Sequence, residues 1–385
     1  MIERDVLVIG GGIAGASIAY HLAHTHQRRV TVLEREPHCG VHSTGRSAAL
    51  FMETYGTPLV RALTVGSRAF YEHSPAGFAE HPLLTPRGSM HAAFDLGDYD
   101  PRTMLDQEYD AARLTSREVR RLDRDEALAL CPVLDREALV GAVYEPGAMD
   151  MDVHAIHEGF LRGARRAGAQ VLVNQDIRAL ERKAGQWQIE TADGRHAAPV
   201  VVNAAGAWAE QVGRLAGAQP IGLVPKRRSA FVFAAPAGLA FADWPLVIGA
   251  DEGFYFKPDA GMLLGSPANA DPVEPHDVQA EELDIATAIW RIEQISSLRI
   301  RRPTRVWAGL RSFVADGDLV GGFDPDLDGF FWLAAQGGYG IQTAEGMARA
   351  CAALIAKSPM PDDLAQLGVS AQALSPGRLR TASRA

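Results

Sequence analysis

The sequence predicts an α/β fold with a buried parallel sheet, and three features near its start carry that prediction. Residues 6–9 form a short apolar run rich in β-branched residues, typical of a buried parallel strand. Gly10, Gly12 and Gly15 follow at G-x-G-x-x-G spacing and lead into an apolar helical stripe. A second apolar strand is expected over residues 30–33. This order of strand, glycine turn, helix and strand is typical of a Rossmann-like dinucleotide-binding unit.

The glycine turn and the acid that ends the second strand each suit one part of a dinucleotide. Gly10 permits the tight turn, Gly12 lets the backbone approach a pyrophosphate, and Gly15 lets helix and strand pack closely. The helix N-terminus offers unpaired N–H groups to the phosphate oxygens. Glu34 is placed to accept the ribose hydroxyls. A coincidental tight turn is the alternative, and the complete order of elements argues against it.

Length, charge and cysteine content narrow the class of protein. The 385 residues suffice for two domains with full cores. A net charge of −9 offers no basic surface, so nucleic acid is not an expected partner. No run approaches the ~18 uninterrupted apolar residues of a membrane helix, and we expect no secretory signal before the first strand. The three scattered cysteines form neither a disulfide framework nor a C-x-x-C motif, so we expect a cytoplasmic protein.

Three further loops are expected to converge on the same elongated ligand. The polar loop of residues 42–47 precedes apolar residues suited to a lid over a pocket. The sequence NAAGAW follows a buried strand at residues 200–202, and a glycine turn after residues 330–334 feeds a long alanine-rich helix. An enzyme that binds a nicotinamide cofactor does not need three such loops around one ligand. An enzyme that binds the longer flavin adenine dinucleotide (FAD) does. Elsewhere we expect helices over 58–73, 116–130, 153–168 and 282–299, with Trp290 facing inward, and an irregular acidic loop over 95–110.

Five segments spread over the chain resemble one family of flavoproteins. The chain resembles the D-amino-acid oxidase (DAO) superfamily, which includes glycine and sarcosine oxidases, and within it most closely the bacterial D-arginine dehydrogenase branch. The segments are HSTGRSAA (42–49), PKRRSAF (225–231), GMLLGSPANADPVE (261–274), GLRSFVADGD (309–318) and AAQGGYGIQT (334–343).

The resemblance implies two discontinuous domains. The first is a Rossmann-like FAD-binding domain of the glutathione-reductase-like, DAO type, and the second is an α+β substrate domain on a mainly antiparallel sheet. We expect residues 1–82, 146–220 and 316–375 in the FAD-binding domain, 83–145 and 221–315 in the substrate domain, and 376–385 as a frayed tail.

The resemblance also assigns residues to the cofactor. Relatives with covalent flavin attach it to a cysteine in the region of residues 309–318. This chain has no cysteine there, so noncovalent FAD is expected. The expected FAD-binding residues are Gly10, Gly12, Ile13, Ala14, Gly15, Glu34, Arg35, Thr44, Arg46, Ser47, Ala48, Ile177, Ala205, Gly206, Trp208, Gly309, Gly337, Gly338, Tyr339, Gly340, Ile341 and Gln342.

By the same resemblance, two arginines would anchor a substrate carboxylate. Arg311 would form a bidentate clamp on the carboxylate with Arg228 beside it. Tyr255 would donate a further hydrogen bond, and Tyr55 would lie in the lid near the amine. The carbonyl of Gly338 would accept from the amino group and orient the Cα–H bond. The alternative for Arg228 is an ordinary surface charge, because basic residues adjoin it.

The expected side-chain pocket departs from that of the D-arginine branch. Ser89 stands where that branch has an acid, and a buried guanidinium without a counter-charge is costly by several kcal/mol. Apolar D-amino acids are therefore expected in preference to D-arginine. The pocket residues are expected to be Leu50, Met52, Ser89, Leu246, Ile248 and Gln342.

The predicted function is oxidative deamination of D-amino acids to imino acids, which hydrolyse to 2-oxo acids and ammonia. A second hypothesis for the substrate is a glycine- or sarcosine-type amine or an N-substituted amino acid. Two hypotheses from different classes are a flavin scaffold without turnover and an NAD enzyme. The electron acceptor is left open between oxygen and a quinone. No metal is expected, because His21, His24 and His26 have no ligand partners at the right spacing and suit an exposed helix end.

Overall fold

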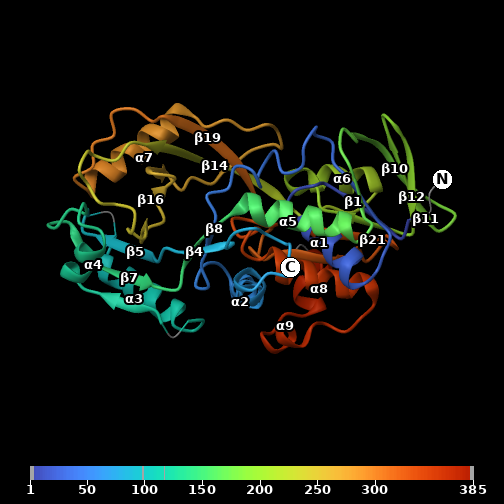
Figure 1. The fold of residues 1–385 in the computed structure, drawn as a ribbon, viewed down its shortest axis with the longest axis horizontal. Coiled ribbons are helices and arrows are strands. Elements are labelled where there is room, and N and C mark those ends of the chain that lie inside the picture. The colour runs from blue at the N-terminus through green and yellow to red at the C-terminus, as the bar shows by residue number, and fades with distance from the viewer. Residues whose placement is uncertain (1–3, 98, 117, 382–385) are drawn as a thin grey trace.

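The computed structural model describes residues 4–97, 99–116 and 118–381, which form two parts side by side (Figure 1). The part that holds both marked chain ends is built on a six-stranded sheet with the order β20-β21-β13-β1-β2-β9. Its strands are parallel except β20, which runs antiparallel to β21. The strands are β1 (Val6–Ile9), β2 (Val30–Leu33), β9 (Gln170–Leu172), β13 (Val200–Asn203), β20 (Val320–Phe323) and β21 (Phe330–Ala334).

Both faces of this sheet are covered, which explains why β1 is apolar at every position. Val6 and Val8 pack with the helices on one face, and Leu7 and Ile9 pack with a small sheet on the other. The helices are α1 (Ile13–Tyr20), its π-helical continuation η1 (His21–Thr25), α5 (Val153–Arg166) and α8 (Ala344–Ala356). The other face carries α6 (Ala209–Ala216) and the sheet β10-β11-β12 (Ile177–Lys183, Gln186–Thr191, Gly194–Ala198).

The second part is built on a nine-stranded sheet that is mainly antiparallel. Its order is β18-β14-β17-β16-β15-β5-β7-β6, with β19 pairing with β14, and β15 is parallel to β5. Helix α7 (Glu282–Gln294) packs against this sheet, and α3 (Pro101–Ala112) and α4 (Arg124–Leu130) lie at its far end. The strands are β5 (Ser89–Phe94), β6 (Arg120–Leu122), β7 (Leu139–Glu145), β14 (Val224–Phe233), β15 (Leu246–Gly249), β16 (Tyr255–Asp259), β17 (Met262–Ser266), β18 (Asp271–Pro272) and β19 (Arg305–Phe313).

A small sheet and a helix lie between the two parts (Figure 1). The sheet is β3-β8-β4, formed by Leu50–Phe51, Met149–Met151 and Leu84–Pro86, and the helix is α2 (Pro58–Glu72). The long strands β14 and β19 reach from the second part toward the first. Short helices complete the chain: η2 (Gly206–Trp208), α9 (Asp362–Gln366), α10 (Ala371–Leu374) and α11 (Gly377–Thr381). In the described part of the chain, no helix is long and apolar enough to cross a membrane.

Helical expectations were wrong in the region between residues 95 and 130. Residues 101–112 form α3 instead of a loop, because Asp100 caps the helix and a proline occupies its first turn. Of the helix expected over residues 116–130, only α4 (Arg124–Leu130) forms. Its N-terminus is capped by reciprocal hydrogen bonds between Asp123 and Glu126, a capping box. The strand β6 precedes it.

Three further expectations from the sequence were also wrong. Trp290 is 60% exposed rather than inward, and α7 ends at Gln294. His21 is buried against α8 instead of lying at an exposed helix end. The chain after residue 375 is ordered as far as Thr381, since Arg378 forms an ion pair with Asp316 at 2.8 Å. Residues 382–385 of the expected tail lie outside the described residues.

Candidate active site

One elongated cavity runs along the carboxyl edge of the parallel strands and under β14 and β19. It comprises about 1720 Å³ of space free of protein atoms, part of which is open solvent at its mouth. Ligands of open α/β sheets bind at this edge. It is lined by most residues that the sequence assigned to FAD: Gly10, Gly12, Ile13, Ala14, Glu34, Arg35, Thr44, Arg46, Ser47, Ala48, Ile177, Ala205, Gly206, Trp208, Gly309, Gly337, Gly338, Gly340 and Ile341.

The glycine turn permits the close approaches that the sequence predicts. Gly10 has a φ of +100°, and a Cβ atom there would lie 2.5 Å from the carbonyl oxygen of Ala204. A Cβ atom on Gly15 would lie 1.8 Å from the carbonyl oxygen of Gly10, so only glycine lets α1 pack this closely on β1. Gly15 itself is therefore a packing residue behind the cavity wall. The Ile13 N–H at the start of α1 donates to Oγ1 of Thr44 at 3.0 Å.

Glu34 is buried and organises the backbone around the turn. One carboxylate oxygen accepts from the N–H of Gly11 at 2.7 Å, and the other accepts from the N–H of Glu36 at 2.9 Å. His157 of α5 donates through Nε2 to the carbonyl of Gly11 at 2.8 Å. Sequence reasoning missed His157, because nothing local to residue 157 indicates a contact with a turn 146 positions earlier.

Arg35 and His42 pack against Trp208 at the end of the cavity that we assigned to the adenosine half. The guanidinium carbon of Arg35 lies 3.9 Å from the ring centroid of Trp208, a cation–π contact. The ring of His42 lies 4.7 Å from the same indole, and its Nε2 is 2.9 Å from Glu36. His42 and Glu36 were not among the predicted site residues. Ile177 also lines the cavity.

The loop of residues 42–47 is tied to β19 by its own polar groups. Ser43 donates to the carbonyl of Leu310 at 2.7 Å, and Nη1 of Arg46 donates to the carbonyl of Val278 at 2.9 Å. Arg46 also forms an ion pair with Asp277. The indole N–H of Trp307 donates to the carbonyl of Arg46 at 3.0 Å. The guanidinium of Arg46 thus fixes the cavity wall.

Arg228 and Arg311 face the same cavity from neighbouring antiparallel strands. Arg228 pairs with Gly309 and Arg311 pairs with Lys226, so the two arginines are diagonal neighbours on one face of the sheet. Burial, together with the positive charge of Arg311, lowers the pKa of Arg228. Two adjacent guanidiniums in one buried cavity form a site for an anion.

Tyrosines and a glycine surround Arg311. Burial opposes its charge, but the hydroxyls of Tyr55, Tyr255 and Tyr339 outweigh that effect and raise the pKa of Arg311. A Cβ atom on Gly338 would lie 2.9 Å from Nη1 of Arg311, so the guanidinium packs directly against the glycine. The rings of Tyr55 and Tyr339 are 5.0 Å apart. Neither tyrosine lines the cavity itself, whereas Tyr255 does.

The segment that carries Tyr55 is held by two buried side chains from distant parts of the chain. Glu145 accepts from the N–H of Glu53 at 2.8 Å and from Oγ1 of Thr54 at 2.5 Å. Burial raises the pKa of Glu145. Gln342 is hydrogen-bonded to the backbone N–H and carbonyl of Met52, at 3.3 and 3.2 Å. The side chain of Gln342 therefore holds this segment and does not line the cavity.

The expected side-chain pocket is closed in the structure. Leu50, Met52 and Leu246 are buried together in one apolar cluster with Ala148, and Tyr55, Ile248 and Tyr255 pack against it. Ser89 is the register partner of Leu246 on the neighbouring strand, and it lines a second, small cavity with His91 and Glu145. Among the residues that the structure describes, those lining the long cavity include none of the six expected pocket residues: Leu50, Met52, Ser89, Leu246, Ile248 and Gln342.

The residues that line the cavity fit FAD. The cavity is long, the glycine turn lets backbone approach a pyrophosphate, and the N-terminus of α1 faces it. The residues of the glycine turn and of the α1 N-terminus would hold the adenosine half and the pyrophosphate. Gly337, Gly338 and Ile341, at the other end, would lie beside the flavin ring. Over residues 4–97, 99–116 and 118–381, no cluster of three or more potential metal ligands occurs.

Two known proteins similar to this chain are named as a dehydrogenase of dimethylglycine and an oxidase of glycine. The chain is 28% identical to dimethylglycine dehydrogenase of Rattus norvegicus over 220 residues, or 56% of this chain, and so spans about a quarter of that protein (25%). It is 25% identical to glycine oxidase of Geobacillus kaustophilus over 95% of this chain and 96% of that protein. The narrower likeness to D-arginine dehydrogenases, expected from the sequence, is not supported by these relatives.

Solved structures show the same fold, and a family profile covers most of the chain. Glycine oxidase of Geobacillus kaustophilus superposes with a TM-score of 0.80 at 23% identity, covering 95% of this chain and 98% of that one. Iminodiacetate oxidase of Chelativorans sp. BNC1 superposes with a TM-score of 0.79 at 23% identity, covering 96% and 98%. The profile described as FAD dependent oxidoreductase (DAO) matches residues 5–354. The chain therefore belongs to the DAO family of FAD-dependent oxidoreductases, with FAD as its cofactor.

Proposed function

We propose that this flavoenzyme oxidises the amine of glycine or of an N-substituted glycine. One observation carries the proposal: a pair of cavity-facing arginines lies beside an apolar cluster that is already filled. The arginines provide an anchor for a carboxylate, and the filled cluster leaves no pocket for a side chain on the substrate α-carbon. This is the second substrate hypothesis that the sequence left open, and we now prefer it to a D-amino acid with a large side chain.

The carboxylate anchor follows from charge and geometry. Arg228 and Arg311 are adjacent, and the pKa of Arg228 is lowered by burial and by the charge of Arg311. A bound carboxylate would relieve that repulsion through charge-assisted hydrogen bonds, which are about twice as strong as neutral ones. Tyr255 lines the same end of the cavity and offers a further hydroxyl donor.

The filled cluster favours a substrate whose α-carbon carries no side chain. Leu50, Met52 and Leu246 bury one another, and inserting a substrate side chain would require them to separate. Overpacking of this kind typically costs about 1–3 kcal/mol. The names of three similar proteins agree, because glycine, dimethylglycine and iminodiacetate all contain a glycine unit and differ only at nitrogen.

The chain's own residues orient the substrate and do not supply a nucleophile. When bound, FAD supplies the acceptor for a hydride from the substrate carbon. Arg311 and Arg228 would fix the carboxylate, and the carbonyl of Gly338 would accept a hydrogen bond from the amine. The rate of hydride transfer depends more on this orientation than on a strong general base. Oxygen or a quinone would then reoxidise the cofactor.

Substrate preference tests the proposal. We expect glycine, sarcosine or N,N-dimethylglycine to reduce the flavin with a kcat/KM at least about tenfold above that of D-leucine, D-phenylalanine or D-arginine, because a clash of about 1.4 kcal/mol costs a factor of ten. Anaerobic bleaching of the flavin by each compound measures this. Leu246→Ala should raise the D-leucine to glycine ratio by making room. A wild-type enzyme that prefers D-leucine or D-arginine would contradict the proposal.

The carboxylate clamp can be tested by substitution. Arg311→Met should lower kcat/KM for every amino acid substrate by about 10²-fold or more, since losing a bidentate charged pair costs about 3 kcal/mol. Arg305→Met is the matched control, because Arg305 lies on the same strand but is exposed and contacts Trp307. If both variants keep wild-type kcat/KM in steady-state assays, Arg311 is not in the site.

The FAD is expected to be noncovalent. Cys131 and Cys351 are buried in the protein cores, and Cys39 is half-buried behind Gly11. Burial raises the pKa of Cys39 to about 11, which leaves a poorly reactive thiol. Precipitation with acid should release all of the yellow colour into the supernatant. Colour that stays with the pellet would mean a covalent link.

A further inference from the structure

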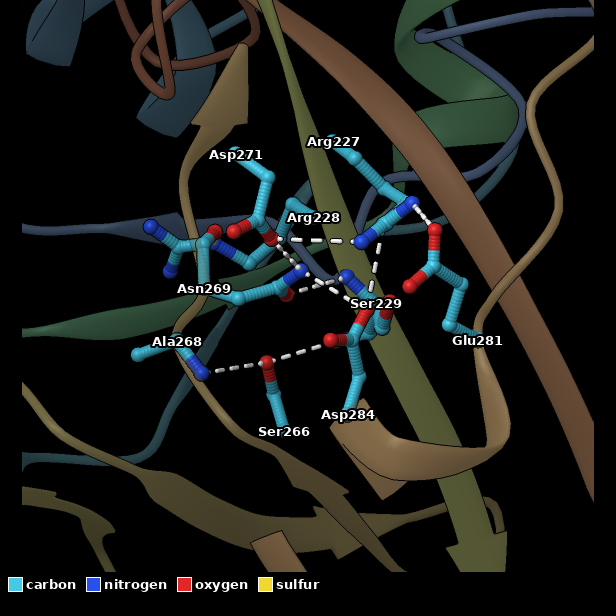
Figure 2. A network of polar contacts seen from close by, with 9 residues as sticks. All are labelled: Arg227, Arg228, Ser229, Ser266, Ala268, Asn269, Asp271, Glu281 and Asp284. Carbon is cyan, nitrogen blue, oxygen red and sulfur yellow. Dashed lines mark hydrogen bonds and ion pairs between the residues drawn. The ribbon is translucent and has the colours of Figure 1, made fainter. Parts of the chain in front are cut away.

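We infer that Asn269 and Asp284 are positioning residues that hold Arg228 in place for the substrate carboxylate. The inference rests on the carboxylate site proposed above. Figure 2 shows the network: Arg228 and Arg227 leave the same strand, and Asn269 lies between Arg228 and the acidic residues around Arg227. Neither Asn269 nor Asp284 lines the long cavity, so each would act through Arg228.

The strand β14 turns its two consecutive arginines to opposite faces, as the alternation of a strand requires. Arg228 lines the cavity, whereas Arg227 is buried, with 8% exposure, among three acids. Its Nε is 3.1 Å from Asp284, its Nη2 is 3.4 Å from Asp271, and its Nη1 pairs with Glu281. These ion pairs fix β14 against the start of α7 and the strand β18.

Asn269 connects that buried network to the face of β14 that lines the cavity. Its main-chain carbonyl accepts from Nε of Arg228 at 2.6 Å. Its side-chain oxygen accepts from the N–H of Ser229 at 2.8 Å, and its Nδ2 donates to Asp271 at 2.7 Å and to Asp284 at 3.0 Å. The side chain is therefore fixed at both its acceptor and its donor, and it fixes the carbonyl that Arg228 uses.

Asp284 is the point where the network converges. A single oxygen, Oδ2, accepts from Nε of Arg227 at 3.1 Å, from Oγ of Ser229 at 2.9 Å and from Nδ2 of Asn269 at 3.0 Å. Asp284 lies in the first turn of α7, where a negative charge is favoured by the helix dipole. Removing its carboxylate would release Asn269 from one of its two acidic partners.

The backbone before Asn269 requires such support. Ala268 has a φ of +52°, a left-handed conformation that residues other than glycine rarely adopt. Oγ of Ser266 accepts from the N–H of Ala268 at 3.1 Å and donates to the carbonyl of Ser229 at 2.7 Å. A strained backbone persists only when its surroundings over-determine it, and the hydrogen bonds around Asn269 do so.

The consequence for Arg228 is a fixed orientation. Nε is occupied by the carbonyl of Asn269, and within the described chain no hydrogen bond partner occurs for the two terminal nitrogens. Those two nitrogens form the side of the guanidinium that a carboxylate would bind. If Asn269 loses its side-chain contacts, the carbonyl shifts and Arg228 loses the contact that sets this orientation.

The test is the affinity of the FAD-loaded protein for acetate, measured by isothermal titration calorimetry. Acetate carries the carboxylate alone, so the measurement does not depend on turnover. Asn269→Ala and Asp284→Ala should each raise the Kd for acetate about tenfold, and Asp284→Asn should raise it less because an oxygen remains. Glu281→Ala is the matched control, since Glu281 contacts Arg227 and not Asn269. The Kd of this variant for acetate should stay within about twofold of the wild-type value.

A background with Arg228→Met separates positioning from general destabilisation. There, Asn269→Ala should leave the already weakened Kd unchanged, because the residue it positions is absent. An unaltered Kd for Asn269→Ala in the wild-type background would overturn the inference, as would an equal loss in both backgrounds. Should Asp284→Ala fail to fold, Asn269→Ala and Asp284→Asn still decide the matter. A wild-type protein that binds no acetate would overturn the proposed carboxylate site as well, and the wild-type titration alone reveals that case.

Discussion

The closeness of two half-buried guanidiniums, those of Arg228 and Arg311, is the constraint on which the rest of the site depends. They are diagonal neighbours on β14 and β19, and burial together with the charge of Arg311 lowers the pKa of Arg228. Proteins rarely bury charged groups unless they are paired. A pair of cations facing the cavity is therefore the basis of our proposal of an anionic substrate group, and a carboxylate matches the planar fork of an arginine.

Much of the surrounding structure holds these two charges in place. The tyrosine hydroxyls around Arg311 raise its pKa, and Gly338 lets the guanidinium pack against the backbone. On the opposite face, Arg227 and its acidic partners anchor β14. Glu145 and Gln342 hold the segment that brings Tyr55 to the site. These contacts hold the end of the cavity that we propose for the carboxylate, and the apolar cluster would restrict what else a substrate carries.

Features coded by neighbouring residues could be predicted from the sequence. The strand VLVI, the glycine spacing and Glu34 lie within one βαβ unit, so their placement follows from local pattern. Contacts between distant segments could not be predicted in this way. His157, Asn269 and Glu145 act on residues 146, 41 and 92 positions away, and no local pattern marks them. The predicted side-chain pocket stays a prediction, and its packing could not be foreseen for a related reason. A family likeness places Leu50 and Ser89 near a substrate, but only the packing shows that Leu50 is in a filled cluster and Ser89 is in another cavity.

The most direct measurement compares two substrates that differ only in the group the arginines would bind. Sarcosine carries a carboxylate, and its primary amide has the same amine and α-carbon without the charge. In anaerobic stopped-flow reduction of the bound FAD, the account predicts that the amide is at least about 100-fold less efficient, which corresponds to ~2.7 kcal/mol of lost binding. Equal efficiency for sarcosine and its amide would show that Arg228 and Arg311 do not hold a substrate carboxylate.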